Sequence, residues 1–243
     1  MNTQIKTTKI DTTHTLLIDI ESCRQLDITP IAAWFNTDFW RENNAITGVA
    51  EGRGTTLFVE HQAQAMVLRH YCRGGMVRHL NHDIFFGFST EHTRPFQELS
   101  LLRYMHSCHL PVPTGIAGLV SRVGCGYRAD LVTARIPDAT DIHQLISQAP
   151  ISEEAWARVG QTIKKMHQAQ VYHHDLNIKN IMLDNHEQVW LIDFDKCRKQ
   201  EGNEWKQSNL NRLLRSLNKQ KTKFPDYCFE PQNWQALVQG YHE

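Results

Sequence analysis

Two short stretches carry residues whose types and spacing fit phosphoryl chemistry. HHDLNIKN places Asp175 five residues before Asn180, and the apolar run VWLID ends at a second aspartate, Asp193. Carboxylate and amide oxygens are the ligands that Mg2+ prefers in proteins. Phosphoryl transfer also needs a group that orients or deprotonates the acceptor hydroxyl. We therefore expect Asp175 to accept the acceptor proton, and Asn180 and Asp193 to hold the metal ion.

Two other interpretations of this polar cluster are a metal-dependent hydrolase site that begins at HHD, and a polar turn with no chemical role. Asp193 closes an apolar strand thirteen residues after Asn180. Neither alternative explains that arrangement, whereas a metal site built from both stretches does.

The first half of the chain is predicted to be rich in strands. Five runs are apolar or alternate between apolar and polar residues, which is typical of strands, and the last two flank a glycine-containing turn at 124–126. They cover residues 15–20, 46–61 with a glycine-rich connection, 63–71, 115–123 and 127–136.

Helices are predicted between these strands and in the second half. Thr29 and Pro30 have the types favoured at a helix start, as has Ser152 further on. The predicted helices cover residues 27–43, 95–109, 152–168 and part of 196–223. We expect an α+β fold with a strand-rich lobe over 1–136 and a smaller helical lobe over 137–243.

Charge and composition narrow the class of protein. Basic and acidic residues balance at 26 each, so overall charge indicates no nucleic-acid partner. Residues 196–223 hold nine basic and two acidic residues, which suits an anionic surface or phosphorylated ligand; the alternative is a solvated helix face. No apolar stretch follows a basic start and no eighteen apolar residues run together, so we expect a cytoplasmic protein without a membrane span.

The spacing H-x-D-L-x-x-x-N over 173–180, followed by D-F at 193–194, resembles the catalytic and metal loops of the protein-kinase-like fold. The resemblance implies phosphate-binding parts upstream. Gly48, Gly52 and Gly54 fall where the glycine-rich loop belongs, although an ordinary hairpin turn would also use them. Arg69 stands where such kinases usually have lysine and still supplies a permanent cation. Glu98 matches the acid that pairs with this cation; otherwise it is a first-turn acid favoured by the helix dipole.

Two departures narrow the resemblance. Asp195 replaces the glycine of D-F-G, and only 48 residues follow it, too few for the activation segment and helical platform that hold peptides. What remains is similar to the lipopolysaccharide kinase family, most closely its kinases of 3-deoxy-D-manno-octulosonic acid (Kdo), over about residues 34–198. The strings that carry this are VLRHYCRGG, LPVPTGIAG, HHDLNIKNIMLD and IDFDKCR.

The resemblance implies an enzyme that uses ATP and Mg2+ to phosphorylate the O4 hydroxyl of a Kdo residue on a lipid A precursor. It implies a peripheral position on the cytoplasmic face of the bacterial inner membrane, with no nucleic-acid or protein partner. Two alternatives stay open. One is another sugar kinase of the same fold, such as a heptose kinase. The other is a catalytically silent nucleotide-binding or lipid-surface module.

Overall fold

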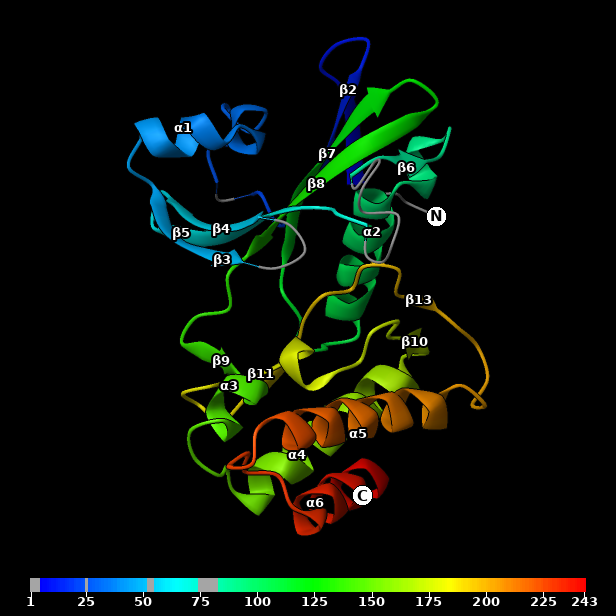
Figure 1. The fold of residues 1–243 in the computed structure, drawn as a ribbon. Coiled ribbons are helices and arrows are strands. Elements are labelled where there is room, and N and C mark those ends of the chain that lie inside the picture. Colours follow the sequence, from blue (N-terminus) through cyan, green and yellow to red (C-terminus); the bar gives the residue numbers. More distant parts are fainter. Residues whose placement is uncertain (1–4, 25, 52–54, 74–82) are drawn as a thin grey trace. The chain divides into compact units, whose positions relative to one another are not determined.

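The computed structural model describes residues 5–24, 26–51, 55–73 and 83–243, which form an α+β structure (Figure 1). The chain divides into two compact units. Unit 1 comprises Met1–Arg103 and Thr114–Arg135, and unit 2 comprises Tyr104–Pro113 and Ile136–Glu243.

Unit 1 is built on one antiparallel sheet of eight strands. Its strand order is β1-β2-β7-β8-β5-β4-β3, and β6 pairs with β8 beyond the end of β5. The strands are β1 Ile5–Lys9, β2 His14–Asp19, β3 Ile46–Glu51, β4 Thr55–His61, β5 Gln64–His70, β6 Phe85–Phe86, β7 Gly115–Val123 and β8 Gly126–Ala134. The strands predicted in this half of the sequence are therefore confirmed, with ends that shift by one or two residues.

The helix predicted over 27–43 is wrong in its extent. The structure has a short 3-10 helix at Ala33–Phe35 and then α1 at Thr37–Glu42. The Asn36 side chain accepts a hydrogen bond from the Asp38 backbone N–H, and this cap starts α1 seven residues after Pro30. The other helix predicted in this half is confirmed as α2, Arg94–Ser107, which carries Glu98.

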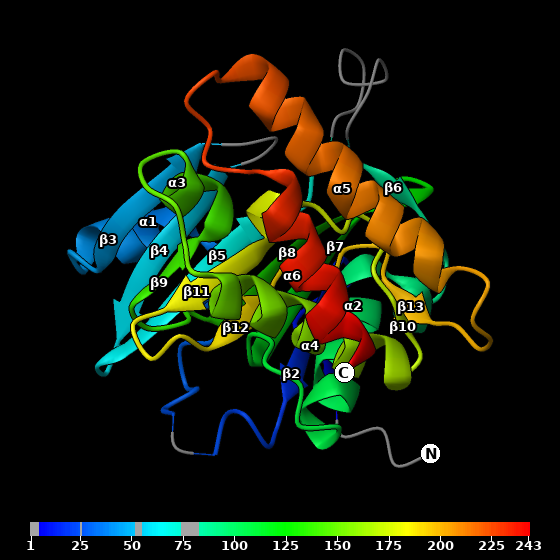
Figure 2. The ribbon, with the colours of Figure 1, turned by 90° about the horizontal axis from the view of Figure 1, so that it is seen from below.

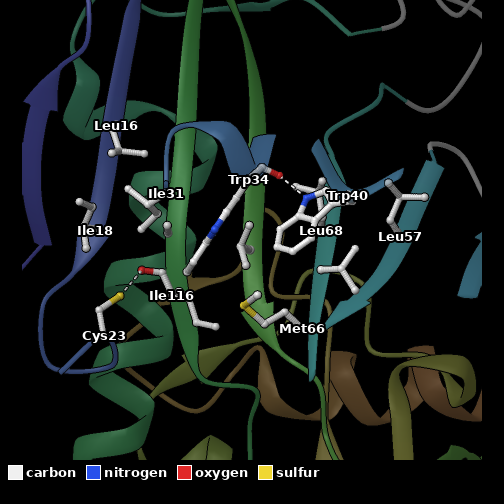
Figure 3. Packing of buried hydrophobic residues seen from close by; sticks show 13 residues of the cluster. Leu16, Ile18, Cys23, Ile31, Trp34, Trp40, Leu57, Met66, Leu68 and Ile116 are labelled. Carbon is white, nitrogen blue, oxygen red and sulfur yellow. Dashed lines mark hydrogen bonds between the residues drawn. The ribbon is translucent and has the colours of Figure 1, made fainter. Parts of the chain in front are cut away.

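The core on one side of this sheet is centred on two tryptophans, Trp34 and Trp40, which are fully buried (Figure 3). The indole N–H of Trp40 donates to the Trp34 carbonyl oxygen at 2.6 Å, and Met66 and Leu68 of β5 lie in the same cluster. Since a buried aromatic side chain contributes a large apolar area, this packing anchors β5 to the core. β5 is the strand that carries Arg69.

Unit 2 contains four α-helices, the short 3-10 helix Ile178–Asn180 and two small sheets. The helices are α3 Ile142–Ile146, α4 Glu153–Gln168, α5 Lys206–Lys223 and α6 Pro231–His242. The strands are β9 Ala139–Asp141, β10 Val171–Tyr172, β11 Ile181–Asp184, β12 Val189–Leu191 and β13 Arg198–Lys199, arranged as β12-β11-β9 and β10-β13. α4 begins as predicted, because Ser152 Oγ accepts from the Ala155 N–H at 3.1 Å.

Helices α4 and α6 approach each other very closely, as Figure 2 shows for the green-yellow α4 and the red α6. A Cβ atom on Gly160 would lie 2.0 Å from the Leu237 carbonyl oxygen, and one on Gly240 would lie 2.1 Å from the Ala157 carbonyl oxygen. The two glycines therefore let the two backbones touch.

Within the described ranges, no helix combines the length and the apolar character that crossing a bilayer requires.

Candidate active site

The spacing between Asn180 and Asp193 is the length of one hairpin in unit 2. β11 and β12 pair antiparallel with Ile181 opposite Leu191. This register brings the residues just outside the hairpin together, and the Ile192 N–H donates to the Asn180 carbonyl oxygen at 3.0 Å. Asp193 follows immediately. The structure thus brings the two predicted metal ligands to the same end of the hairpin.

The backbone at Asp193 is left-handed, with φ at 62°. Residues other than glycine rarely adopt this conformation, which costs of order 1–3 kcal/mol and persists where the surroundings impose it. The next residue, Phe194, has a buried ring, and its centroid lies 5.0 Å from that of His173. Lys196 is left-handed as well, with φ at 60°. The turn that carries Asp193 is therefore anchored by a buried ring next to it.

The loop that carries Asp175 is held by two asparagine side chains. The side-chain amides of Asn177 and Asn180 each donate to the Asp175 carbonyl oxygen at 3.0 Å. Since the Asn180 nitrogen is used in this way, its Oδ1 is the atom suited to a cation. The Asp175 side chain itself is 44% exposed, so a substrate hydroxyl can reach its carboxylate.

His173 joins this loop to the strand end. Its side chain is fully buried, and its Nε2 lies 3.1 Å from the Ile192 carbonyl oxygen. A carbonyl oxygen only accepts, so Nε2 carries the proton. Burial lowers the pKa of His173, so the ring is neutral. His173 therefore braces the loop against the end of the hairpin.

Helix α5 holds the same loop from the other side with three polar residues of one helical face. Asn209 exchanges hydrogen bonds with the His173 backbone: its Oδ1 accepts from the N–H at 3.2 Å, and its Nδ2 donates to the carbonyl oxygen at 3.0 Å. Ser216 Oγ accepts from the Ile178 N–H at 3.0 Å. Between them, Arg212 Nη1 lies 3.4 Å from Asp175 Oδ1.

These three residues were missed in the sequence, where the basic segment was interpreted by its charges. Leu210, Leu213 and Leu217 of the same helix are buried. The available signal was the spacing of Asn209, Arg212 and Ser216, three and four residues apart, which places them on one helix face beside the leucines.

The predicted ion pair of unit 1 is present. Arg69 Nη2 donates to both carboxylate oxygens of Glu98 at 2.7 Å, and the Tyr71 hydroxyl donates to Glu98 Oε2 at 2.6 Å. Glu98 is buried, and the Arg69 side chain is 24% exposed. A buried carboxylate with several donors holds its partner in a fixed orientation, so the guanidinium on β5 is positioned by α2.

Gly48 lies in β3, next to a shift in the register with β4. A Cβ atom there would lie 3.2 Å from Phe58 Cδ2, so the absence of a side chain relieves packing against β4. Gly52 and Gly54, the other two glycines of the predicted phosphate loop, lie outside the described residues.

Comparisons with known proteins agree with this geometry. The model of the lipopolysaccharide kinase (Kdo/WaaP) family matches residues 37–241. A 3-deoxy-D-manno-octulosonic acid kinase from Vibrio cholerae is 45% identical over 86% of this chain and 88% of its own length. The enzyme of the same name from Pasteurella multocida is 42% identical over 86% of this chain and 90% of its own length.

Among solved structures, one described as WaaP in complex with acyl carrier protein superimposes with a TM-score of 0.56 at 18% identity, and covers 88% of this chain and 86% of that one. At that identity the likeness concerns the fold, and it supports the predicted protein-kinase-like fold with a strand-rich part and a reduced helical part. The family match spans most of the sequence, including both polar stretches. The chain therefore belongs to the lipopolysaccharide kinase (Kdo/WaaP) family.

Proposed function

We propose that this chain is a Kdo kinase, which transfers the γ-phosphoryl group of ATP to a hydroxyl of a Kdo residue in lipopolysaccharide core biosynthesis. The finer proposal is that the acceptor is the O4 hydroxyl of a Kdo residue on a lipid A precursor. The single observation that carries the proposal of a kinase is the hairpin. It brings Asn180 beside Asp193 while the Asn180 side-chain amide holds the Asp175 loop. The names of relatives at 40–45% identity support the choice of Kdo.

The donor atoms of this hairpin end fit Mg2+. One amide oxygen, from Asn180, and one carboxylate, from Asp193, are hard oxygen ligands, and Mg2+ commonly takes one or two such ligands together with phosphate oxygens and water. When bound, the ion would neutralise charge on the donor phosphates. We propose Asn180 and Asp193 as its protein ligands.

The remaining roles follow from exposure and charge. Asp175 orients the acceptor hydroxyl and takes its proton, because its carboxylate is accessible and its loop is fixed by two amides. Arg69, oriented by Glu98, binds donor phosphate, and the glycine-rich connection at Gly48, Gly52 and Gly54 covers it. In this proposal the strand-rich lobe over 1–136 binds the nucleotide and the lobe over 137–243 carries the catalytic and metal loops.

The test is transfer of labelled γ-phosphate from Mg-ATP to a Kdo-bearing lipid A precursor. We expect phosphate on the sugar with wild-type protein, and a loss of about 100-fold or more with Asp175→Asn or Asp193→Asn. Glu187→Gln is the matched control, because this carboxylate is exposed at the far end of the same hairpin.

Two outcomes would point to the alternatives. Transfer to heptose-bearing acceptors in preference to Kdo would favour a different sugar kinase of this fold. Binding of Mg-ATP without transfer to any sugar of the panel would favour the silent nucleotide-binding module. The peripheral position at the inner membrane is part of the same proposal, since the acceptor is a lipid.

A further inference from the structure

Arg212 of α5 is fixed in place, yet most of its hydrogen-bonding capacity is unused. Its neighbours on the same helix face, Asn209 and Ser216, anchor this face to the loop that carries Asp175. Only one guanidinium nitrogen, Nη1, meets a carboxylate, and its distance of 3.4 Å from Asp175 Oδ1 is long for a charged hydrogen bond. The other nitrogens of Arg212 have no hydrogen-bond partner among the described residues. The guanidinium can therefore take a second anion.

A second cation, Lys196, lies near the same loop. Its side chain is exposed, and in the part of the chain that the structure describes it forms neither a hydrogen bond nor an ion pair. Burial is the largest cause of a lowered pKa at His174, and the charges of Lys196 and Arg212 lower this pKa further. Asp175 and Asp195 raise it by less. Positive charge therefore prevails around His174, which directly precedes Asp175.

The proposed acceptor sugar carries a negative charge close to its reacting hydroxyl. Kdo is an octulosonic acid, and in its ring form the carboxylate is attached to C2. Only C3 separates C2 from C4, which bears the proposed acceptor hydroxyl. When that hydroxyl meets Asp175, the two carboxylates lie at short range and repel each other unless a cation pairs with both. Arg212 already contacts Asp175 and has further nitrogens to offer, whereas a neutral sugar would need no such cation.

We propose that Arg212, assisted by Lys196, binds the carboxylate of the acceptor sugar and so selects a sugar acid over a neutral sugar. The forked guanidinium suits the two oxygens of a carboxylate, and the ammonium group adds a point charge. The donor phosphates have Mg2+ and Arg69 in the proposed function, so the cation on α5 is left for the acceptor. The inference rests on that function for the identity of the acceptor and for the hydroxyl at Asp175. It adds the group of the substrate that α5 recognises.

The test compares two acceptors that differ only at this group, the Kdo-bearing lipid A precursor and the same compound with its Kdo carboxylate converted to a carboxamide. With wild-type protein, we expect the carboxamide to lower kcat/KM about tenfold to 100-fold. With Arg212→Ala, the two acceptors should differ by less than about threefold, because the partner of the carboxylate is gone. Arg212→Lys should restore part of the difference, since it keeps the charge without the fork. A purely structural role would lower activity equally with both acceptors.

Two further variants and a third acceptor sharpen this comparison. Lys196→Asn removes the second charge with a residue that tolerates the left-handed backbone at this position, where φ is 60°. It should reduce the difference between the two acceptors about threefold. Arg215→Ala is the matched control on the exposed side of α5 and should discriminate as wild type does. A precursor without lipid A phosphate groups separates the carboxylate from the other anions of the lipid.

Equal kcat/KM of wild type for carboxylate and carboxamide would overturn the proposal, as would full discrimination by Arg212→Ala. An effect of Arg212→Ala that vanishes with the phosphate-free precursor would overturn it as well, and would assign the arginine to lipid A phosphate.

Calorimetric binding of both acceptors in detergent, without nucleotide, separates this proposal from the proposed function. Binding that prefers the carboxylate and depends on Arg212, without any phosphate transfer, would support the carboxylate site and count against the kinase. Transfer without discrimination would count against the site alone. Neither binding nor transfer would count against both.

Discussion

Arg69 Nη2 donates to both carboxylate oxygens of Glu98, although the two residues lie on different elements, β5 and α2. The pair is largely buried, and Tyr71 supplies a third hydrogen bond to the same carboxylate. A buried carboxylate held in this way orients the guanidinium, and removing one partner would leave an uncompensated charge. The pair therefore links the folding of unit 1 to the proposed binding of donor phosphate by Arg69.

Two replacements of Arg69 separate the effect of its positive charge on activity from the effect of its forked hydrogen-bond geometry. Arg69→Met should lower kcat/KM for ATP about 100-fold or more, because it removes the cation proposed for the donor phosphates. Arg69→Lys keeps the charge but loses the forked donor, so we expect an intermediate loss of about tenfold. Steady-state kinetics with varied ATP measure both.

Tyr71→Phe is the control for this pair, because it removes one hydrogen bond to Glu98 and leaves both charges in place. Its kcat/KM should stay within about threefold of wild type, in line with a neutral hydrogen bond of modest net value. If Arg69→Met behaved like Tyr71→Phe, the guanidinium would be structural only.

Arg212 is expected to act on substrate and to contribute little to stability. Its contact with Asp175 is long, at 3.4 Å, and both side chains are more than 40% exposed, so the pair should add less than about 1 kcal/mol to folding. A cation beside the proposed base is well placed for an anionic group of the donor or acceptor. We expect Arg212→Ala to lower kcat/KM by about tenfold to 100-fold without changing Tm by more than a few degrees, and Arg212→Lys to recover part of it.

Arg215→Ala provides the matched control for Arg212, since this exposed arginine lies three residues further along the same helix. A general effect of helix charge would lower activity equally in both variants, and that result would contradict a specific role for Arg212. The separate changes in kcat and KM would show whether the arginine acts in ground-state binding or in the transition state.

Local features of the site were predictable and long-range ones were not. The D-x-x-x-x-N loop and Asp193 lie directly on either side of one short hairpin, so the sequence indicated their proximity. Glu98 was found because a family pattern connects it to Arg69. The contacts of Asn209 and Arg212 span 36 and 37 residues, and no local pattern encodes such a separation.

The wrong extent of the helix at 27–43 has a local cause that the sequence did show. Asn36 lies inside the predicted range, and its side chain competes for backbone N–H groups and so favours a helix start. Trp34 precedes that helix start and Trp40 follows it, and both side chains are fully buried. Burial of the tryptophans and capping by Asn36 outweighed the start signal of Thr29 and Pro30.

His167 should make stability depend on pH. Burial lowers its pKa from 6.5 to about 4, and it contacts the Tyr241 hydroxyl at 2.8 Å through Nδ1. Below pH 6.5 the unfolded chain binds a proton at this histidine, and the folded chain does so only near pH 4. The free energy of unfolding should therefore fall as pH drops through this window, by up to about 3 kcal/mol from this residue.

Urea unfolding between pH 7 and pH 4.5 measures this dependence. We expect a shallower loss of stability for His167→Gln, because the glutamine side chain does not titrate. His92→Gln, which changes an exposed histidine, should keep the slope of wild type. An identical slope for all three proteins would show that other groups cause the acid sensitivity.

The contact between α4 and α6 offers a test of packing in which two effects oppose each other. Alanine is favoured over glycine inside a helix by about 1 kcal/mol, so Gly160→Ala and Gly240→Ala would stabilise isolated helices. In the structure, each new Cβ would meet a carbonyl oxygen of the facing helix at about 2 Å, and this backbone cannot move aside without separating the helices. We expect the clash to win, with each variant destabilised by about 3 kcal/mol or more in urea unfolding.

Gln235→Ala, at an exposed position of α6, should change stability by less than about 0.5 kcal/mol. Variants at Gly160 or Gly240 that matched this control would show that the two helices do not need to touch.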